Sequence, residues 1–212
     1  MYIRSVNVGM AVDADWAGEL KRTAIDKSAV LGRVRVGDNG LAGDERADKE
    51  HHGVPDQAVY AYAREDYDWW ENELGRELRD GRFGENLTTV GIDVNECKLG
   101  ERWRVGDVVL EVTSPRVPCV IFRNWLDERG WVKRFTQARR IGTYFKVLEQ
   151  GELGVGDKIE VLYVPQESVT IRESFLAYHG DRELLRRILA TPGRAARWDR
   201  VAARVFRDTT PV

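Results

Sequence analysis

The chain has 212 residues, of which 42% are hydrophobic, and its 33 Lys and Arg against 35 Asp and Glu give a net charge of −2. This length predicts one large domain, or one domain with a small appendage. A nearly neutral chain has no general attraction to nucleic acid or to an anionic membrane. No apolar run approaches the roughly 20 residues of a membrane span, and the N-terminus lacks an export signal. We therefore expect a cytoplasmic protein.

Two cysteines, Cys97 and Cys119, are too few for a disulfide framework, and a reducing cytoplasm disfavours even one bridge. The sequence has no CxxC pair and only three histidines, so it lacks the ligand spacing of a zinc site. Cys97 lies in NECKLG, which predicts an exposed turn without a catalytic role. Cys119 lies in SPRVPC between prolines and arginines. A structural thiol, a nucleophile and a metal ligand all remain open for it.

Short strands are predicted through the first two-thirds of the chain. Runs of β-branched and aromatic residues favour strands in YIRSVNV (2–8), VLGRVRV (30–36) and AVYAYA (58–63). A Gly-Asp turn opens an alternating strand in two further segments, 104–112 and 154–162. The similarity of these two segments predicts that similar hairpins recur in one mainly β domain. A barrel closes such strands without leaving exposed edges.

Two helices are expected within this part. Four apolar residues of segment 64–80 recur at helical spacing, which predicts a helix with a core-facing stripe. They are Tyr67, Trp70, Leu74 and Leu78. A second helix is expected directly after Cys119, with Pro118 as the breaker before it.

The composition changes at about residue 166, where Arg, Leu and Ala become frequent. The segment splits at HGD and TPG into three helical pieces, with Asp181 and Thr191 where N-caps belong and Pro192 in a first turn. We therefore expect a C-terminal three-helix domain over 166–212. So few residues make a marginal core alone, so this domain is expected to pack on the main domain or on a partner.

Residues 116–140 form a basic segment, with seven cationic side chains against two acidic ones and a local charge of +5. Cations beside Cys119 favour its thiolate form. They also suit an anionic ligand, because guanidinium groups match phosphate geometry. The alternative is a solvated basic face. The cations are Arg116, Arg123, Arg129, Lys133, Arg134, Arg139 and Arg140.

Four polar stretches, three of them with glycine or proline, are not explained by a strand or helix pattern: TAIDKSAV (23–30), residues 40–59, FGENLT (83–88) and SPRVPC (114–119). Loops carry binding residues disproportionately, and glycines such as Gly84 permit close approach to a ligand. Ordinary turn chemistry is the alternative for any one stretch. Four of them in a chain of this size favour a shared site.

The pieces TAIDK, GLAGDERAD, HGVPDQAV, FGENLT and PRVPC, in this order, resemble the MOSC-domain family. More narrowly they are similar to its bacterial subgroup that confers resistance to N-hydroxylated base analogues. The resemblance covers about residues 1–165 and implies a MOSC β-barrel with peripheral helices. The tail resembles the three-helix domain that follows MOSC in that subgroup. The family as a whole is also linked to pyridoxal phosphate.

The resemblance implies binding of the molybdenum cofactor, a molybdopterin that carries molybdenum. Cys119 is the implied sulfur ligand, which agrees with thiolate as a soft ligand for a soft metal. The relatives usually have a Gly and a Lys where this chain has Val54 and Gln57, which removes one phosphate-binding cation. The other candidates are cations for the pterin phosphate and hydrogen-bonding groups for the pterin or substrate. The cations are Lys27, Arg64 and Arg116, and the hydrogen-bonding groups are Asn86 and His52.

Related enzymes reduce N-hydroxylated compounds such as hydroxylaminopurines to amines, so the resemblance implies a molybdenum-dependent reductase. The candidate proton donors are Glu85, Asp44 and His52. The sequence has no flavin, iron–sulfur or nucleotide motif, so we expect electrons from a separate redox protein. The helical tail would dock this donor or stabilise a homodimer.

Two other functions remain open. The protein could carry the cofactor without catalysis, or Cys119 could carry sulfur as a persulfide. Nucleic-acid binding has little support, because the basic segment lacks the interleaved aromatic residues of a single-strand groove.

Overall fold

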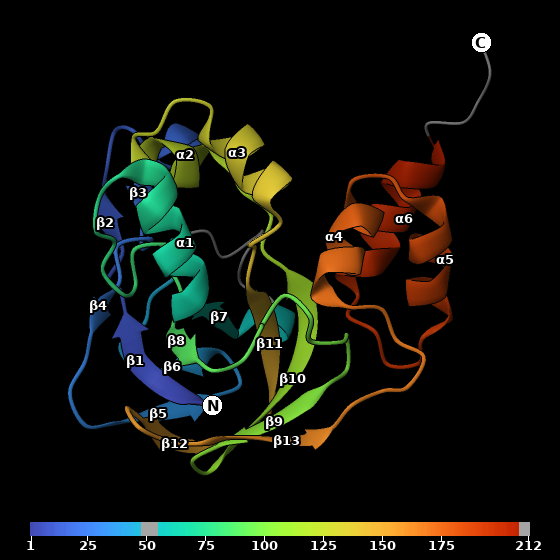
Figure 1. The fold of residues 1–212 in the computed structure, drawn as a ribbon, viewed down its shortest axis with the longest axis horizontal. Coiled ribbons are helices and arrows are strands. Elements are labelled where there is room, and N and C mark those ends of the chain that lie inside the picture. Colours follow the sequence, from blue (N-terminus) through green and yellow to red (C-terminus); the bar gives the residue numbers. More distant parts are fainter. Residues whose placement is uncertain (48–54, 208–212) are drawn as a thin grey trace.

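A computed structural model describes residues 1–47 and 55–207 of the chain. Its centre is an eight-stranded sheet in the order β13-β9-β10-β11-β7-β8-β1-β4 (Figure 1). Neighbouring strands are antiparallel except for β7 and β8, which are parallel. The strands are β1 (Tyr2–Val8), β4 (Ser28–Ala29), β7 (Val59–Ala63), β8 (Leu87–Val90), β9 (Arg102–Val105), β10 (Val108–Pro115), β11 (Thr143–Glu149) and β13 (Ile159–Tyr163).

Two smaller sheets accompany this large sheet. One has the order β12-β5-β6, and the other pairs β2 with β3. Their strands are β2 (Val12–Asp13), β3 (Arg22–Thr23), β5 (Arg33–Gly37), β6 (Gly40–Leu41) and β12 (Gly151–Gly154). Strand β5 alternates buried and exposed residues, whereas β7 and β10 are buried along their whole length. Strands buried on both faces belong to the centre of a fold.

The fold is therefore mixed, with sheets and helices, and the expected closed barrel is not present among the described residues. The large sheet ends at β13 and β4. Residues 1–3 and 156–159 are joined by an isolated bridge between Tyr2 and Lys158 and by three backbone hydrogen bonds, but not by a strand ladder that closes the sheet. The chain leaves this sheet after β11, because β12 pairs with β5. The Gly-Asp turn at 106–107 closes the β9–β10 hairpin as predicted. The turn at 156–157 closes no hairpin, since β12 and β13 belong to different sheets.

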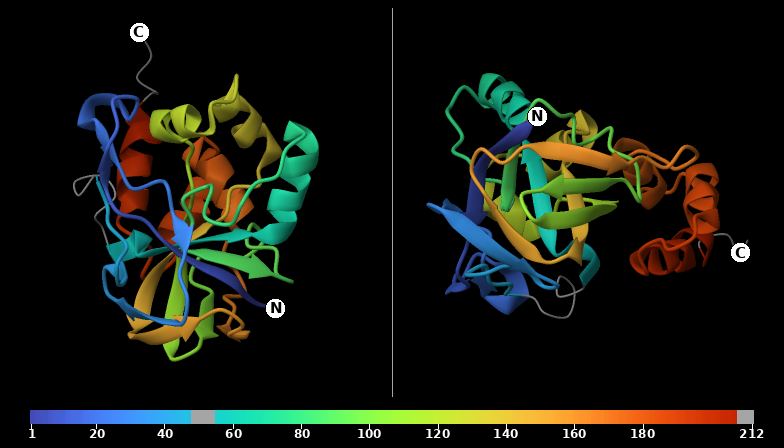
Figure 2. Two further views of the ribbon diagram at one scale, coloured as in Figure 1. Left: turned by 90° about the vertical axis from the view of Figure 1, so that its left-hand side faces the viewer. Right: turned by 90° about the horizontal axis from the view of Figure 1, so that it is seen from below.

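Three helices lie on one side of the large sheet (Figures 1 and 2). They are α1 (Arg64–Leu74), α2 (Val120–Leu126) and α3 (Trp131–Ala138). Helix α2 begins directly after Cys119, as predicted, whereas α3 was not foreseen. The prediction of one helix over 64–80 was too long. Gly75 takes a left-handed conformation with φ of 65° and ends α1, a common way for a helix to stop.

An aromatic cluster joins these helices to the FGENLT loop. The Phe83 ring lies 4.7 Å from Tyr67 of α1, 5.2 Å from Phe122 of α2 and 5.5 Å from Trp131 of α3, measured between ring centroids. All four side chains are fully buried. Such packing fixes the position of the residues that follow Phe83 on their way into β8.

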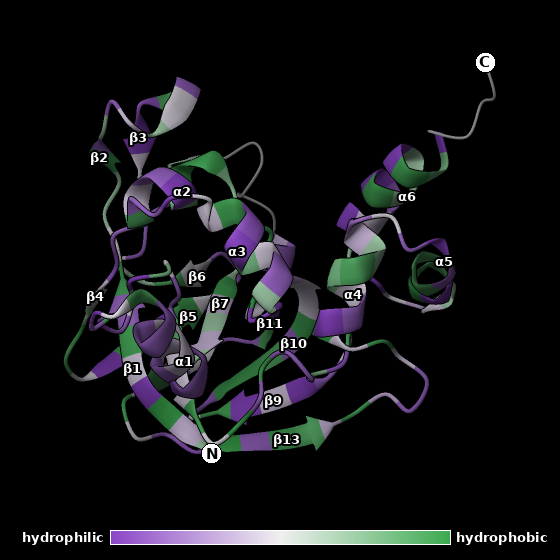
Figure 3. Cartoon of the chain, turned by 45° about the horizontal axis from the view of Figure 1, so that its top comes forward, coloured by the Kyte–Doolittle hydropathy of each residue, from purple (hydrophilic) through white to green (hydrophobic). Residues whose placement is uncertain are grey.

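The C-terminal helices are α4 (Ile171–Tyr178), α5 (Arg182–Ala190) and α6 (Arg197–Arg207), and they lie at the side of the molecule, next to β10 (Figure 1). Helix α6 carries both hydrophilic and hydrophobic residues (Figure 3), and it buries Trp198, Val201 and Val205. Asp181 caps α5 as predicted. Thr191 instead follows the end of α5, and α6 begins only at Arg197, so the prediction for Thr191 and Pro192 was wrong.

The three C-terminal helices are joined to the rest of the chain by backbone hydrogen bonds. Leu99 N donates to Val169 O at 2.9 Å, and Ile171 N donates to Cys97 O at 2.8 Å. This unit therefore packs on the main body of the same chain. A domain boundary near residue 165 stays a prediction. No helix within 1–47 and 55–207 is long and apolar enough to cross a bilayer.

The start of α4 offers a test of stability. Thr170 and Glu173 form a reciprocal capping box, in which each side chain accepts from the other's backbone N–H. Replacing Thr170 by Ala is expected to lower the free energy of unfolding by about 1 kcal/mol. Thr191→Ala is the control, because that hydroxyl only donates to Arg187 O after its helix has ended. Equal urea midpoints for the two variants would contradict the assignment.

Candidate functional site

A pocket of about 150 Å³ lies where β7, β11 and the end of β10 meet the loops around residues 24, 45 and 85. Five of the eight residues predicted for the site line it, and they come from all four polar stretches. These five are Lys27, Asp44, Asn86, Arg116 and Cys119. His52 and Val54 lie outside the described residues.

Cys119 stands at the wall of this pocket, between the end of β10 and the first residue of α2. Its thiol is free and half-buried. Pro118 is buried directly before it. Cys97, which we expected to be exposed, is buried at 3% exposure, and burial raises the pKa of its thiol. Of the two thiols, only that of Cys119 lines the pocket.

Arg116 is the cation beside this thiol. Its Nη1 donates to Tyr144 Oη at 3.3 Å, and its guanidinium lies 5.1 Å from the Tyr60 ring and 4.9 Å from the Phe122 ring. Burial alone would lower its pKa, but the Tyr144 and Tyr60 phenols and the Cys119 thiol raise it above the ordinary value. No carboxylate within the described ranges pairs with Arg116. The charge is thus available for an anionic ligand.

Lys27, Asp44 and Asn86 form a chain of polar contacts in the same pocket. Lys27 Nζ pairs with Asp44 Oδ1, which also accepts from Gly9 N at 2.8 Å. Asn86 Nδ2 donates to Asp44 Oδ2 at 2.8 Å, while its Oδ1 accepts from Tyr60 N at 3.1 Å. Burial lowers the pKa of Lys27, although Asp44 opposes this effect. Both oxygens of Asp44 are therefore occupied, and the Lys27–Asp44 pair is neutral as a whole.

Glu85 does not line the pocket, although its neighbour Asn86 does. It is fully buried, and its carboxylate accepts hydrogen bonds from Tyr67 Oη at 2.8 Å, Thr88 Oγ1 at 2.8 Å and the backbone N–H groups of Gly81 and Phe83. Burial raises the pKa of Glu85 despite these donors. Its position is that of a group that holds the 81–85 turn together.

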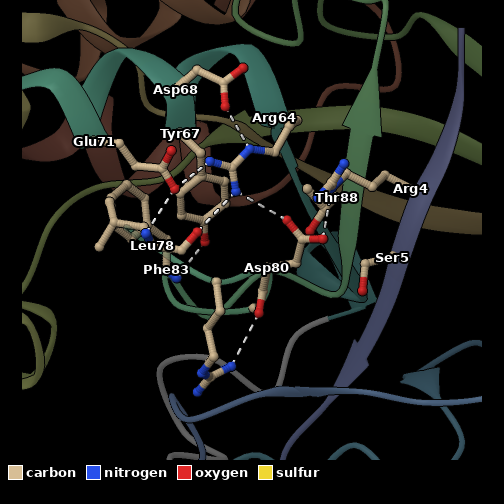
Figure 4. Close-up of polar contacts among 12 residues, drawn as sticks. Arg4, Ser5, Arg64, Tyr67, Asp68, Glu71, Leu78, Asp80, Phe83 and Thr88 are labelled. Atoms are coloured by element: carbon tan, nitrogen blue, oxygen red, sulfur yellow. Dashed lines mark hydrogen bonds and ion pairs between the residues drawn. The ribbon is translucent and has the colours of Figure 1, made fainter. Parts of the chain in front are cut away.

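Arg64, the first residue of α1, lies outside the pocket as well, and its side chain is only 13% exposed (Figure 4). Its guanidinium pairs with Asp68 at 2.7 Å, with Glu71 at 2.5 Å and with Asp80 at 3.4 Å. These three carboxylates satisfy its charge, so Arg64 is not placed to bind a ligand in the pocket.

The basic segment 116–140 does not gather at the pocket. Arg116 lines the pocket, but Arg140 pairs with Asp66, and Arg134 lies 3.9 Å from Glu128. The local charge of +5 is thus spread over two helices and their turns. Only one of its seven cations contributes to the pocket as described.

Tyr60 and Tyr144 were not predicted, yet both line the pocket. Their rings lie 4.9 Å apart, because the residues are register partners in β7 and β11. Tyr144 also pairs with Ser114 of β10 on its other side. Nothing local in the sequence marks the two tyrosines, since they become neighbours only when these strands pair.

The metal-binding capacity of the site is limited. Within the described part of the chain, no group of three or more His, Cys, Asp or Glu side chains could hold a metal ion. The pocket offers one soft ligand, the Cys119 thiol, and the cation Arg116, which pairs with no carboxylate of residues 1–47 and 55–207. This donor set suits a metal that brings most of its ligands with it, within an anionic cofactor.

Comparisons with known proteins found a domain family and several relatives that this chain resembles. The model of the MOSC domain matches residues 48–160. YflK of Bacillus subtilis (strain 168) is 31% identical over 199 residues, which are 92% of this chain and 90% of that protein. The crystal structure of YiiM from Geobacillus stearothermophilus matches with a TM-score of 0.80 and 26% identity, over 96% of this chain and 98% of that one.

A third relative is longer than this chain. A protein of Gibberella moniliformis (strain M3125 / FGSC 7600), named "Reductase", is 34% identical over 165 residues. The match spans 76% of this chain but only 29% of that protein.

Proposed function

The chain belongs to the MOSC domain family, and from this premise we propose that it binds the molybdenum cofactor and reduces N-hydroxylated compounds to amines. MOSC domains are generally linked to molybdenum cofactor binding. A relative named as a reductase supports an oxidoreductase activity. The observation that carries the proposal is the half-buried Cys119 thiol in one pocket with Arg116, a cation without a carboxylate partner among the described residues.

The residues of the pocket fit such a cofactor. Cys119 would supply one thiolate, a ligand type that soft metal centres prefer. Arg116 would hold the anionic phosphate, since its planar guanidinium can donate two parallel hydrogen bonds. The volume of about 150 Å³ encloses only part of a large cofactor, because ligand pockets usually measure roughly 300–1,000 Å³. The metal end beside Cys119 is the part we assign to it.

When bound, the cofactor would supply the redox centre at which the N–O bond is cleaved. Cys119 would fix this centre by its sulfur, and Asn86 would hold Asp44 and the Tyr60 backbone in place at the pocket wall. Reduction of N–OH to N–H also consumes protons. Asp44 is the one carboxylate among the predicted donors that lines the pocket, and both its oxygens already accept hydrogen bonds. We therefore assign proton delivery to Lys27 Nζ, whose lowered pKa eases release of a proton.

Electrons would come from a separate redox protein, because the sequence carries no flavin, iron–sulfur or nucleotide motif. A small N-hydroxylated molecule such as a hydroxylaminopurine would be the substrate. A homodimer stays a prediction.

The test uses protein loaded with molybdenum cofactor and a reduced viologen dye as the electron donor. Conversion of 6-hydroxylaminopurine to adenine is followed by chromatography, and bound molybdenum by elemental analysis. Cys119→Ser is expected to lose more than about tenfold in bound molybdenum, together with the activity. Cys97→Ala is the matched control, because this thiol lies outside the pocket, and it should keep both.

Three results would contradict the proposal. Full molybdenum content and rate in Cys119→Ser would remove its basis. Bound molybdenum without turnover of any N-hydroxylated compound would indicate a cofactor carrier. A mass gain of one sulfur atom on Cys119, without metal, would indicate a persulfide carrier.

A further inference from the structure

The first turn of α6 is tied to the end of β10 by two side-chain hydrogen bonds. Arg197 Nη1 donates to Ser114 Oγ at 2.9 Å, and Trp198 Nε1 donates to Thr113 O at 3.2 Å. Both acceptors lie near the end of β10, just before the residues that line the pocket. Trp198 is fully buried at this junction, so the contact belongs to the packed interior.

A second hydrogen bond, from the residue just before α6, reaches another segment of the chain. Ala196 N donates to Asp56 Oδ2 at 3.2 Å. Asp56 belongs to the short 3₁₀ helix η2 (Pro55–Gln57), and its carbonyl oxygen accepts from the Thr113 hydroxyl. Gln57, the next residue, lines the pocket. One helical turn therefore contacts both β10 and η2.

The position of Ser114 makes this contact relevant to the pocket. Ser114 is the register partner of Tyr144 across β10 and β11, and it lies two residues before Arg116, which follows the end of β10. Arg116 and Tyr144 are bonded to each other in the pocket. Arg197 itself is half-buried, and its guanidinium lies 5.8 Å from the Tyr178 ring centroid. It has no carboxylate ion-pair partner in ranges 1–47 and 55–207.

We infer that the first turn of α6 braces the pocket, and that Arg197 is a positioning residue that acts through Ser114 on Arg116 and Tyr144. The brace comes from outside the segment matched by the MOSC model, which ends at residue 160. The C-terminal helices would thus set the geometry around Cys119, in addition to packing on the sheet. The inference about the brace itself needs no cofactor, and only its effect on cofactor binding rests on the proposed function.

Thiol reactivity tests the brace directly. The chain has two cysteines, so in a Cys97→Ala background only Cys119 reacts with iodoacetamide, and mass spectrometry follows the rate in cofactor-free protein. Loss of the brace lets the end of β10 open more often, so Arg197→Gln should react at least about threefold faster. Arg197→Lys keeps a donor near Ser114 and should restore most of the slow rate.

Arg200→Gln is the matched control, because Arg200 is an exposed arginine on the same helix, three residues after Arg197. It should react at the starting rate. Ser114→Ala removes the same hydrogen bond from the other partner and should resemble Arg197→Gln, so a folding defect of one variant does not decide the matter. Rates for Arg197→Gln and Ser114→Ala equal to that of Arg200→Gln would overturn the inference.

Cofactor loading separates this inference from the proposed function. If the brace is right and the cofactor binds, Arg197→Gln should also bind molybdenum less tightly than Arg200→Gln. Suppose that the thiol rates differ as expected, but that neither the unaltered chain nor any variant binds molybdenum. In that case the brace is supported and the proposed function is wrong. If molybdenum binds equally well to both variants and the thiol rates are equal, the brace fails and the proposed function stands.

Discussion

Replacing Glu85 by Gln is expected to lower the free energy of unfolding by about 3 kcal/mol at pH 5, the largest stability change among these predictions. The buried carboxylate accepts from four donors, of which Thr88 Oγ1 and Tyr67 Oη lie at 2.8 Å. A glutamine side chain has only one acceptor oxygen. Its amide nitrogen, itself a donor, would face those donor groups that now bond to the second carboxylate oxygen, and they would lose their acceptor. Urea unfolding measures the change.

Glu77→Gln is the control for this variant, since that side chain is exposed, and it should stay within about 0.5 kcal/mol of the original chain. The variant also separates a structural role of Glu85 from a catalytic one. With a structural role, the folded fraction of Glu85→Gln keeps its rate per bound molybdenum. A rate that falls while stability is unchanged would instead restore Glu85 as a proton donor.

The pH dependence has a definite sign. Burial raises the pKa of Glu85, so the folded chain keeps this proton to a higher pH than the unfolded chain does. The stabilisation from this group is fully present below about pH 4.3, the ordinary pKa of glutamate, and is lost as the pH rises through the folded-state pKa. The difference in stability between the original chain and Glu85→Gln should therefore shrink from acid toward neutral pH. A constant difference would contradict the raised pKa.

Replacing Arg116 by Gln is expected to weaken binding of the molybdenum cofactor about 100-fold, if the proposed function holds. This guanidinium is the pocket cation beside Cys119, and without it the phosphate would be left without its partner in a partly buried place. Arg116→Lys keeps the charge but loses the planar donor pair, so about a tenfold loss is expected. Titration of the cofactor-free protein, with tryptophan fluorescence as the signal, measures both values.

Arg123→Gln is the matched control for Arg116, because Arg123 belongs to the same basic segment but is exposed and does not line the pocket. It should bind the cofactor as the original chain does. If Arg123→Gln weakened binding as much as Arg116→Gln, the whole basic segment would act by its long-range field, and the specific role of Arg116 would be wrong.

Local sequence patterns predicted most of the elements, and they failed where a glycine conformation decided the outcome. The strand over 2–8 and the cap at Asp181 were confirmed, because alternation and capping are local properties. Thr191 and Pro192 look like a helix start, but Gly193 takes a φ of 70°, which no second residue of a helix can have. The barrel was not confirmed, because the pairing of β12 with β5 depends on contacts far apart in the chain.

The prediction of the site residues also succeeded where it rested on local sequence and failed where it depended on the three-dimensional arrangement. The polar stretches predicted which loops meet, but not which side of each loop faces the pocket. Glu85 and Asn86 are neighbours that enter β8, and adjacent residues of an extended chain point to opposite sides, so only Asn86 reaches the pocket. Arg64 could have been set aside from the sequence, since Asp68 stands four residues later on the same helix and pairs with it.

The pairing of β11 between β10 and β7 also determines when, during folding, the pocket can first bind a cofactor. During synthesis, Cys119 leaves the ribosome before the strand that carries Tyr144, and the pocket has no floor until that strand has inserted between its two partners. Such distant pairing forms late in folding. A cofactor bound here would be delivered to a finished fold. It would not guide folding, as the metal of a zinc finger does, so the supply of cofactor would limit activity without limiting the amount of folded chain.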